Sequence, residues 1–185
     1  NLTEAYTAFA NSGKRAAGRM IQSVTDAGGA PLLMFNPDTT QAITPENAYI
    51  MANLLQAVVN EGTGTRARIP GRQIGGKTGT TNDEKDAWFM GFSPYLVTGV
   101  YVGYDQLQPM GRLEGGARTA APIFSYYRKK VEELYPNEEF KKPQDIVMAT
   151  VDAATGELAA GPGGKRLTLP FMTGTAPKHG FSPSG

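Results

Sequence analysis

The chain has 185 residues, and 18 Lys and Arg residues against 17 Asp and Glu residues give it a formal net charge of +1. This balance gives no electrostatic reason to expect nucleic acid or an acidic membrane surface as a partner. Because the sequence has no Cys, disulfides, Cys-based zinc sites and cysteine nucleophiles are excluded. The length suits one ordinary domain or a half-domain with a tail, and 23 Gly and 13 Pro residues predict many turns.

The chain opens inside a helical pattern over residues 2–11, with apolar side chains on one face. A natural N-terminus rarely begins in this way. No signal peptide is visible, and no apolar run is long enough to span a bilayer. We therefore expect export and anchoring segments to lie upstream of Asn1.

Residues 21–25 alternate apolar and polar side chains like a short strand, and residues 32–35 are a second candidate strand. The residues between them, 26–29, form a Gly-containing turn sequence. Together they predict a peripheral hairpin within residues 15–40.

The clearest helix is predicted over residues 45–60. Thr44 is a good N-cap, Pro45 fits the first helical position, and Glu46 suits the positive end of the helix dipole. We expect the helix to pack on a sheet through an apolar stripe at helical spacing. The stripe consists of Ile50, Met51, Leu54, Leu55, Val58 and Val59.

Three strands are predicted next, over residues 74–80, 87–92 and 96–103. Their connections are too short for parallel crossovers, which favours antiparallel neighbours. The polar loop between the first two strands is predicted over residues 82–85.

A second long helix is predicted over residues 117–135, ending before Pro136. Its buried face is expected to consist of Ile123, Phe124, Tyr127, Val131 and Leu134. Arg128, Lys129 and Lys130 are expected on its exposed side, where Glu132 and Glu133 are near enough for pairing.

The regular alternation of predicted helices and strands ends after residue 136. Residues 146–152 are a candidate strand, and residues 161–185 lack periodicity and are predicted to be an extended or partly disordered tail. We therefore divide the chain at residues 1–135 and 136–185, the second part being a partly irregular C-terminal extension.

The motif that carries chemistry is Lys77-Thr78-Gly79-Thr80, at the end of a predicted strand. An exposed strand edge can pair with an extended peptide, and a glycine lets that backbone come close. Thr78 and Thr80 point to the same side by the period of two, so their hydroxyls can bind one carboxylate. Lys77 supplies a positive charge that attracts the carboxylate and can support proton transfer.

A bare Lys-Thr-Gly is weak evidence, but here it stands within an ordered series. The helix is followed by Gly62-Thr63-Gly64-Thr65 and then by the segments at residues 75–82, 86–92 and 97–105, which contain the three predicted strands or most of each. Gly115-Gly116 comes next, at the start of the second helix. This series resembles the C-terminal part of the transpeptidase domain of class A penicillin-binding proteins, the bifunctional peptidoglycan synthases. Lys-Thr-Gly is a signature element of that serine superfamily. The resemblance covers most of residues 1–135.

The resemblance implies an α+β fold in which helices pack on an antiparallel sheet, as part of the penicillin-binding and β-lactamase-like transpeptidase fold. It implies that Lys77 orients or protonates the serine network, and that the backbone N–H of Thr80 gives half of an oxyanion hole. It also implies that the strand segment Thr78, Gly79, Thr80 and Thr81 binds the carboxylate end of a D-Ala-D-Ala stem peptide or of a β-lactam. Trp88 is expected to be core or cleft-wall packing.

The same family needs a Ser-x-x-Lys nucleophile motif and a Ser-x-Asn motif. Neither pattern occurs in residues 1–185. The simplest interpretation is that this chain starts after them, and a degenerate homologue is the alternative. The fragment alone is then expected to be inactive and to depend on the preceding part of the same domain.

The leading function is peptidoglycan D,D-transpeptidation, an acyl transfer through a serine ester that β-lactam antibiotics inhibit. One alternative is a D,D-carboxypeptidase or β-lactamase-type hydrolase, and another is a non-catalytic penicillin-sensing or scaffolding segment. The expected partners are stem peptides of the cell wall and β-lactams, with no cofactor and no metal. The expected location is the periplasmic, extracytoplasmic face of the bacterial inner membrane.

The other polar residues are interpreted as solvated or turn positions without a catalytic role. His179 is the one His in the sequence and lacks partners at ligand spacing, which argues against a metal or triad role. Arg66, Arg68 and Arg72 are expected on a solvated face, although one could touch an anionic substrate. The acidic residues Asp83, Glu84 and Asp86 are interpreted as a polar turn.

Overall fold

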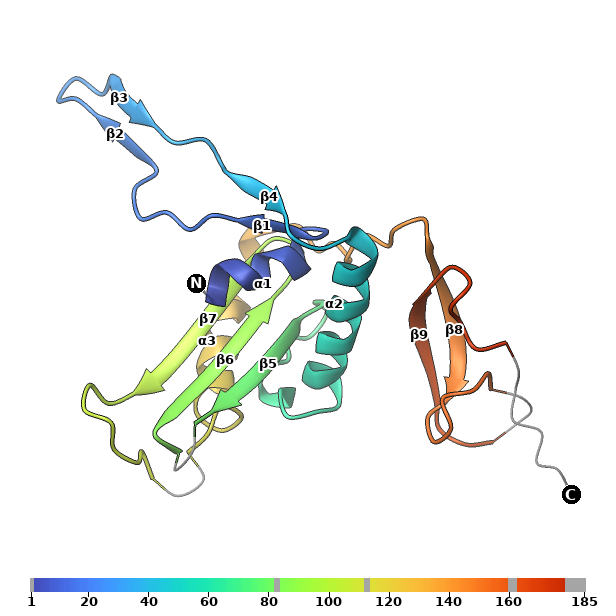
Figure 1. The fold of residues 1–185 in the computed structure, drawn as a ribbon. Helices are drawn as coiled ribbons and strands as arrows, with labels where there is room; N and C mark the ends of the chain where they lie inside the picture. Colours follow the sequence, from blue (N-terminus) through green and yellow to red (C-terminus); the bar gives the residue numbers. More distant parts are fainter. Residues whose placement is uncertain (1, 82–83, 112–113, 160–162, 179–185) are drawn as a thin grey trace, which may run out of the picture.

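A three-stranded antiparallel sheet forms the centre of the computed structural model, which describes residues 2–81, 84–111, 114–159 and 163–178 (Figure 1). Its strands are β5 (Gly75–Thr80), β6 (Asp86–Phe92) and β7 (Val97–Gly103). They lie in the order β5-β6-β7, so β6 is the middle strand. The antiparallel arrangement predicted from the short connections is confirmed.

Helices cover both faces of this sheet. In Figure 1, α1 (Leu2–Ala10) lies in front of β6 and β7, and α3 (Ala120–Val131) lies behind them. On the α3 side, the Phe89 and Phe124 rings are 4.8 Å apart, and both residues are fully buried. On the α1 side, the Phe92 ring packs 6.2 Å from the ring of Phe9. The α+β architecture predicted from the sequence is therefore confirmed.

Helix α2 (Pro45–Asn60) begins and ends at the predicted residues. The Thr44 hydroxyl accepts a hydrogen bond from the Asn47 N–H at 3.3 Å, which confirms the predicted N-cap. The predicted buried stripe is wrong in part, because Met51 is 36% exposed and Leu54 is 49% exposed. The residues that α2 buries are Ala48, Ala52, Leu55 and Val59. Small alanine side chains let the helix come close to its neighbours, and this rotates the larger apolar residues outward.

Helix α3 starts three residues later than predicted and gives way to a 3₁₀ turn, η3 (Glu132–Leu134). The predicted buried face is again wrong in part, since Ile123 and Tyr127 are both 48% exposed and Leu134 is 79% exposed. Arg128 was expected on the exposed side, yet its side chain is fully buried and pairs with Glu132. It donates to the Leu96 carbonyl oxygen at 3.1 Å and to the Ser93 hydroxyl at 2.8 Å. These partners from the β6–β7 turn, together with Glu132, satisfy the two terminal nitrogens of the guanidinium, while its buried Nε has no hydrogen-bond partner among the described residues. A charge can be buried only with such partners.

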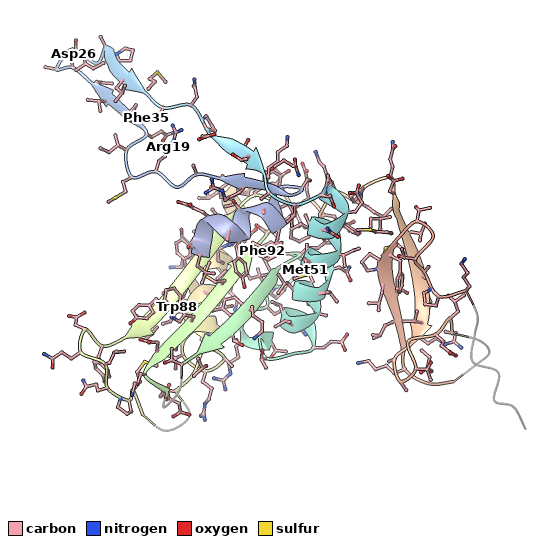
Figure 2. All side chains as sticks on the ribbon, viewed as in Figure 1. Arg19, Asp26, Phe35, Met51, Trp88 and Phe92 are labelled. Atoms are coloured by element: carbon pink, nitrogen blue, oxygen red, sulfur yellow. The ribbon has the colours of Figure 1, made fainter. Side chains whose placement is uncertain are left out.

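The predicted peripheral hairpin is present as β2 (Ser23–Thr25) and β3 (Pro31–Met34), which pair antiparallel. A second short pair, β1 (Lys14–Ala16) and β4 (Thr39–Gln41), joins it to the body and was not predicted. Figures 1 and 2 show this arm projecting from the rest of the molecule, with Asp26 at its tip and Arg19 and Phe35 along it. Every residue of β2 and β3 is exposed.

The C-terminal part contains a further hairpin of β8 (Ile146–Asp152) and β9 (Arg166–Met172). Residues 166–172 therefore contradict the prediction of an irregular tail, while residues 179–185 lie outside the described residues. Phe140 lies in the segment between α3 and this hairpin and is buried. The centroid of its ring lies 5.6 Å from that of the Phe92 ring. The division at residues 135 and 136 stays a prediction.

The remaining short element is η1 (Thr65–Ala67), which follows α2 and whose Ala67 is fully buried. Across the described ranges, none of the helices combines the length and the apolar character that a bilayer crossing needs.

Candidate functional site

The Lys77-Thr78-Gly79-Thr80 motif lies on β5, which is an outer strand of the central sheet. Gly75 and Gly76, at the start of the strand, are buried, whereas Lys77 and Thr80 are exposed and Thr78 and Gly79 are half-buried. Within the described part of the chain, no strand pairs with β5 on the side away from β6. The motif therefore occupies the open half of an outer strand.

Hydrogen bonding at the strand end shows which backbone groups face outward. The Thr81 N–H donates to the Asp86 carbonyl oxygen at 3.1 Å, so Thr81 points towards β6. Because backbone groups alternate along an antiparallel pair, the N–H and C=O groups of Thr78 and Thr80 point to the outer edge. The hydrogen bond at the other end of β6 fits the same alternation. There the Ser93 N–H donates to the Leu96 carbonyl oxygen on the β7 side.

The two threonine hydroxyls of the motif lie on one side of the sheet. Thr78 is opposite Phe89 and Thr80 is opposite Ala87 in the register, and both partners belong to the core on the α3 side. The Thr78 Oγ1 is 3.0 Å from the Thr63 Oγ1. The Thr80 Oγ1 accepts a hydrogen bond from the Gly116 N–H at 3.0 Å, which leaves its own proton free to be donated.

The Lys77 ammonium lies against the outer edge of the strand. Its Nζ donates to the Thr78 carbonyl oxygen at 2.9 Å and is 3.4 Å from the Thr78 Oγ1. The positive charge is thus placed beside one of the two hydroxyls. A cation and hydroxyl donors at one edge are suited to binding an anion such as a carboxylate.

Glycines bring the backbone of a following loop onto the motif. A Cβ on Gly116 would lie 2.6 Å from the Gly79 carbonyl oxygen and 2.4 Å from the Trp88 carbonyl oxygen. A Cβ on Gly115 would lie 2.8 Å from the Thr80 Oγ1. No side chain fits in this contact, which explains the two adjacent glycines.

An acidic and an aromatic residue close the end of the site. The Tyr101 hydroxyl donates to Asp86 Oδ1 at 2.7 Å, and the Asp86 N–H donates to the Thr81 Oγ1 at 2.9 Å. The hydrogen bond from Tyr101 to the Asp86 carboxylate raises the pKa of the tyrosine above its ordinary value. The Trp88 and Tyr101 rings lie 4.7 Å apart, and Figure 2 shows Trp88 on the sheet at some distance from Phe92.

Sequence reasoning found the motif strand but did not predict that four other residues contact and support it. The four are Thr63, Asp86, Tyr101 and Gly116. Asp86 had been interpreted as part of a polar turn, and its hydroxyl partner lies on β7, 15 residues away. The loop length alone carried no signal of this pairing.

The other residues weighed in the sequence do not join the motif. Arg72 donates to the backbone carbonyl oxygens of Pro136 at 2.7 Å and of Tyr135 at 3.1 Å, which is a structural role. Arg68 donates to the Asn60 carbonyl oxygen. Asp83 and His179 lie outside the described residues. Within the described ranges, no group of three or more His, Asp or Glu side chains is arranged to hold a metal ion.

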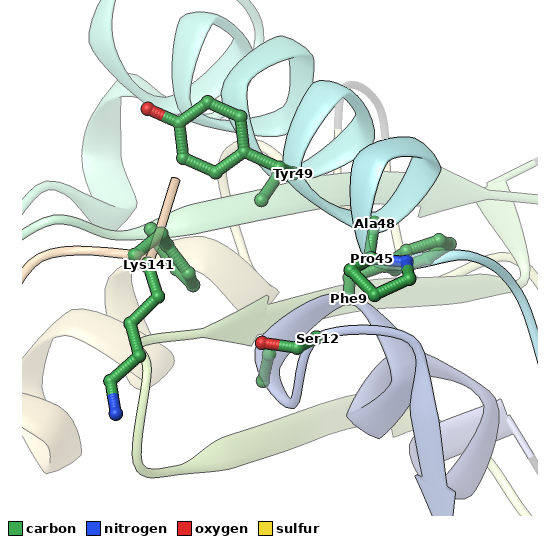
Figure 3. Close-up of a pocket in the computed structure, with 9 residues that line it drawn as sticks. Phe9, Ser12, Pro45, Ala48, Tyr49 and Lys141 are labelled. Carbon is green, nitrogen blue, oxygen red and sulfur yellow. The ribbon is translucent and has the colours of Figure 1, made fainter. Parts of the chain in front are cut away.

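A small cavity elsewhere does not compete with this site. It lies between α1, α2 and residues 140–141, where Figure 3 shows Ser12, Tyr49 and Lys141 around it. Its volume is about 10 Å³, which is room for one water molecule at most. No β5 residue lines it.

Comparison with known proteins gives one consistent result. The penicillin binding protein transpeptidase domain model matches residues 1–127. Penicillin-binding protein 1A of Aquifex aeolicus (strain VF5) is 41% identical over 151 residues, which are 82% of this chain and 21% of that protein.

Solved structures of penicillin-binding proteins superpose on this chain. Penicillin-binding protein 1A from Haemophilus influenzae superposes with a TM-score of 0.86 at 28% identity, over 98% of this chain and 32% of that one. The D,D-transpeptidase domain of a peptidoglycan glycosyltransferase from Eggerthella lenta gives a TM-score of 0.59 at 28% identity, over 72% of this chain and 31% of that one. The chain thus spans about a fifth of the length of the curated relative and about a third of each solved chain.

Proposed function

The chain belongs to the penicillin-binding protein transpeptidase family, and from that premise we propose that the polypeptide containing it is a peptidoglycan D,D-transpeptidase whose residues 77–81 bind the substrate. The predicted resemblance to the C-terminal part of a class A penicillin-binding protein, and to part of its fold, is confirmed. The substrate, the reaction and the residue roles are the proposal.

The observation that carries the proposal is the open outer edge of β5. Thr80 directs its N–H to that edge, and the Lys77 ammonium lies there beside the Thr78 hydroxyl. An extended stem peptide can lie along the edge as an added strand, with its terminal carboxylate against the two threonine hydroxyls and the lysine. A β-lactam offers the same carboxylate and a strained amide in place of the peptide bond.

In the proposed reaction, a serine oxygen attacks the carbonyl carbon of the penultimate D-Ala. The carbon–nitrogen bond breaks, the terminal D-Ala leaves with a proton, and a serine ester remains. An amine of a second stem peptide then attacks the ester, forms the cross-link and returns the proton to the serine. The carbonyl oxygen of the penultimate D-Ala becomes negative in both steps. It accepts one hydrogen bond from the Thr80 N–H and a second from the N–H of the serine itself.

The attacking serine is not part of residues 1–185, which contain neither Ser-x-x-Lys nor Ser-x-Asn. We place both motifs on polypeptide outside these residues, and we expect residues 1–185 alone to be inactive. Peptidoglycan lies outside the cytoplasm, so the proposed site of action is the periplasmic face of the inner membrane, with any membrane anchor also outside these residues.

Labelling with a fluorescent penicillin tests the proposal. In the full natural polypeptide that contains this chain, the label should become covalently attached, and Lys77→Ala should slow labelling by about 100-fold or more because a charge at the reacting edge is lost. Lys178→Ala is a matched control, since Lys178 is exposed and follows strand β9, outside the motif strand. Absence of labelling in the intact polypeptide would favour a non-catalytic scaffold.

A second assay separates transpeptidation from hydrolysis. With D-Ala-D-Ala stem peptides and an amine acceptor, the proposal predicts cross-linked product in excess of hydrolysed product. If hydrolysis dominates at every acceptor concentration, the protein is a carboxypeptidase or a β-lactamase-type enzyme instead.

A further inference from the structure

A cluster of hydrogen bonds closes the end of β5 immediately beyond Thr80. Thr81 and Asp86 face each other across the turn, where the Thr81 N–H donates to the Asp86 carbonyl oxygen at 3.1 Å. The Asp86 N–H donates to the Thr81 Oγ1 at 2.9 Å, and the Thr81 hydroxyl is 3.5 Å from Asp86 Oδ2. The Tyr101 hydroxyl, from β7, completes the cluster at 2.7 Å from Asp86 Oδ1. One carboxylate therefore links all three strands of the sheet at the end that carries the motif.

Two further features show that this linkage is built into the sheet. Asp86 is opposite Gly103 in the register, and a Cβ at Gly103 would lie 2.5 Å from the Tyr101 hydroxyl oxygen and 2.7 Å from Asp86 Oδ1. Only the absence of a side chain lets the tyrosine reach across to the carboxylate. The Tyr101 ring is held in turn by Trp88, 4.7 Å away.

Thr80 is held from the other face as well. The Gly116 N–H donates to its Oγ1 at 3.0 Å, on the α3 side of the sheet. The peptide unit of Thr80 therefore lies between the anchor at Gly116 and the Thr81–Asp86–Tyr101 cluster. Its own N–H is left free of the β6 ladder and directed outward.

We propose that Asp86 and Tyr101 are positioning residues for transpeptidation, which fix the outward direction of the Thr80 N–H through Thr81. This inference rests on the proposed function. It gives the Thr81 hydroxyl a structural task, the bond to Asp86, beside the substrate contact predicted for this residue. Neither Asp86 nor Tyr101 needs to touch the substrate for this effect.

Misplacement of the Thr80 N–H should lower the rate of acylation, because this group is the proposed oxyanion donor. Such a donor stabilises charge that appears only in the transition state, so its misplacement lowers the rate of the chemical step more than the affinity for the ground state. Loss of a whole donor reduces the rate by about 100-fold or more, and a donor that is present but loosely held should cause a smaller loss, of about tenfold.

The test uses the full natural polypeptide, with acylation by fluorescent penicillin resolved into a noncovalent dissociation constant and an acylation rate constant. The variants are Asp86→Ala, Asp86→Asn and Tyr101→Phe, with Tyr104→Phe as the matched control. Tyr104 is 49% exposed and lies just past the end of β7. Thermal unfolding of each variant is measured in parallel.

Asp86→Ala should lower the acylation rate constant about tenfold, with the dissociation constant changed by less than about twofold. Asp86→Asn, which keeps an oxygen for Tyr101, should restore most of the rate. Tyr101→Phe should lower the rate constant about threefold, and Tyr104→Phe should leave both constants unchanged.

Three results would overturn the inference. Unchanged acylation in Tyr101→Phe and Asp86→Ala would show that the cluster only stabilises the fold, whatever happens to the unfolding temperature. A loss confined to the dissociation constant would assign the cluster to substrate binding. If Asp86→Ala does not fold, the acylation rate constant of Tyr101→Phe decides, because this variant removes the hydroxyl that binds Asp86 and keeps the aromatic ring. An intact wild-type polypeptide that is not acylated at all would overturn the proposed function, and this inference with it.

Discussion

The central sheet and the β2–β3 hairpin are both antiparallel, yet they differ in what supports them. The middle strand of the sheet is buried on both faces, with Phe89 against α3 and Phe92 against α1 and Phe140. The hairpin buries none of its strand residues. A two-stranded hairpin in water is marginally stable at best. The difference teaches that the outer edge of β5 is held in place by layers of packed side chains, and that strand pairing alone would not hold it.

The largest difference between the two regions should come from matched aromatic truncations. Phe89→Ala should destabilise the fold by about 3–5 kcal/mol, because the side chain is fully buried and leaves a cavity. Phe35→Ala, at a side chain that is 42% exposed on the arm, should cost less than about 1 kcal/mol. Denaturant unfolding of the two variants measures both values. Equal losses would show that the arm is as firmly supported as the sheet.

A smaller effect is expected from filling space in the sheet. A Cβ at Gly91 would lie 2.5 Å from two ring carbons of Phe124, so Gly91→Ala should destabilise by about 1–3 kcal/mol through overpacking. Gly71→Ala is a less suitable control, because Gly71 has a positive φ of 74°. Ala27→Gly in the exposed turn of the arm serves better. Unchanged stability in Gly91→Ala would mean that α3 can move away from the sheet without loss.

The support that α2 gives to the sheet can be tested at its N-cap. Thr44→Ala removes the acceptor for the Asn47 N–H and should cost about 1 kcal/mol. Thr44→Ser keeps the acceptor and should recover most of this loss. Thermal or denaturant unfolding measures the change, and a cost in the serine variant equal to that in the alanine variant would show that the cap contributes nothing.

The smallest effect is the dependence of the sheet end on pH. The hydrogen bond to Asp86 raises the pKa of Tyr101 above its ordinary value of 10.0. Because the folded-state pKa is raised, the stabilisation by the neutral tyrosine is complete below about pH 10 and is lost as pH rises through the folded-state pKa. The stability difference between wild type and Tyr101→Phe should therefore shrink above pH 10. A difference that stays constant from pH 8 to pH 11 would contradict the assigned bond.

Much of the fold could be predicted because its signals are local. Helix α2 was found to the residue from Thr44 and Pro45, and the bounds of the three sheet strands were found within one residue. Strand β9 was missed because Pro170 and its Gly-rich surroundings argue against a strand. The proline is tolerated since β9 pairs only with β8 within the described residues.

The misplaced helix faces have a tertiary cause. A sequence pattern shows which residues are large and apolar, but it does not show that Ala48 and Ala52 form the contact surface of α2. Nor does it show that Arg128 would find carbonyl and hydroxyl acceptors at Ser93, Leu96 and Thr98. Burial of a charge depends on partners from other elements, which no local window contains.

The candidate site also has features that local sequence predicts and features that depend on long-range contacts. The motif strand, its polarity and the shared side of Thr78 and Thr80 followed from spacing and the period of two. The linkage from Asp86 to Tyr101 depends on strand register, and the contact of Gly116 depends on where a loop returns. No local sequence pattern contains these long-range contacts.

Hydrogen exchange at single amides, measured by NMR in the intact polypeptide with and without covalently bound penicillin, tests the central claim most directly. If the outer edge of β5 binds the ligand, exchange of the Thr80 amide should slow on acylation while exchange in residues 23–34 of the arm stays unchanged. An acylated protein whose Thr80 amide exchanges as fast as in the free protein would contradict the account.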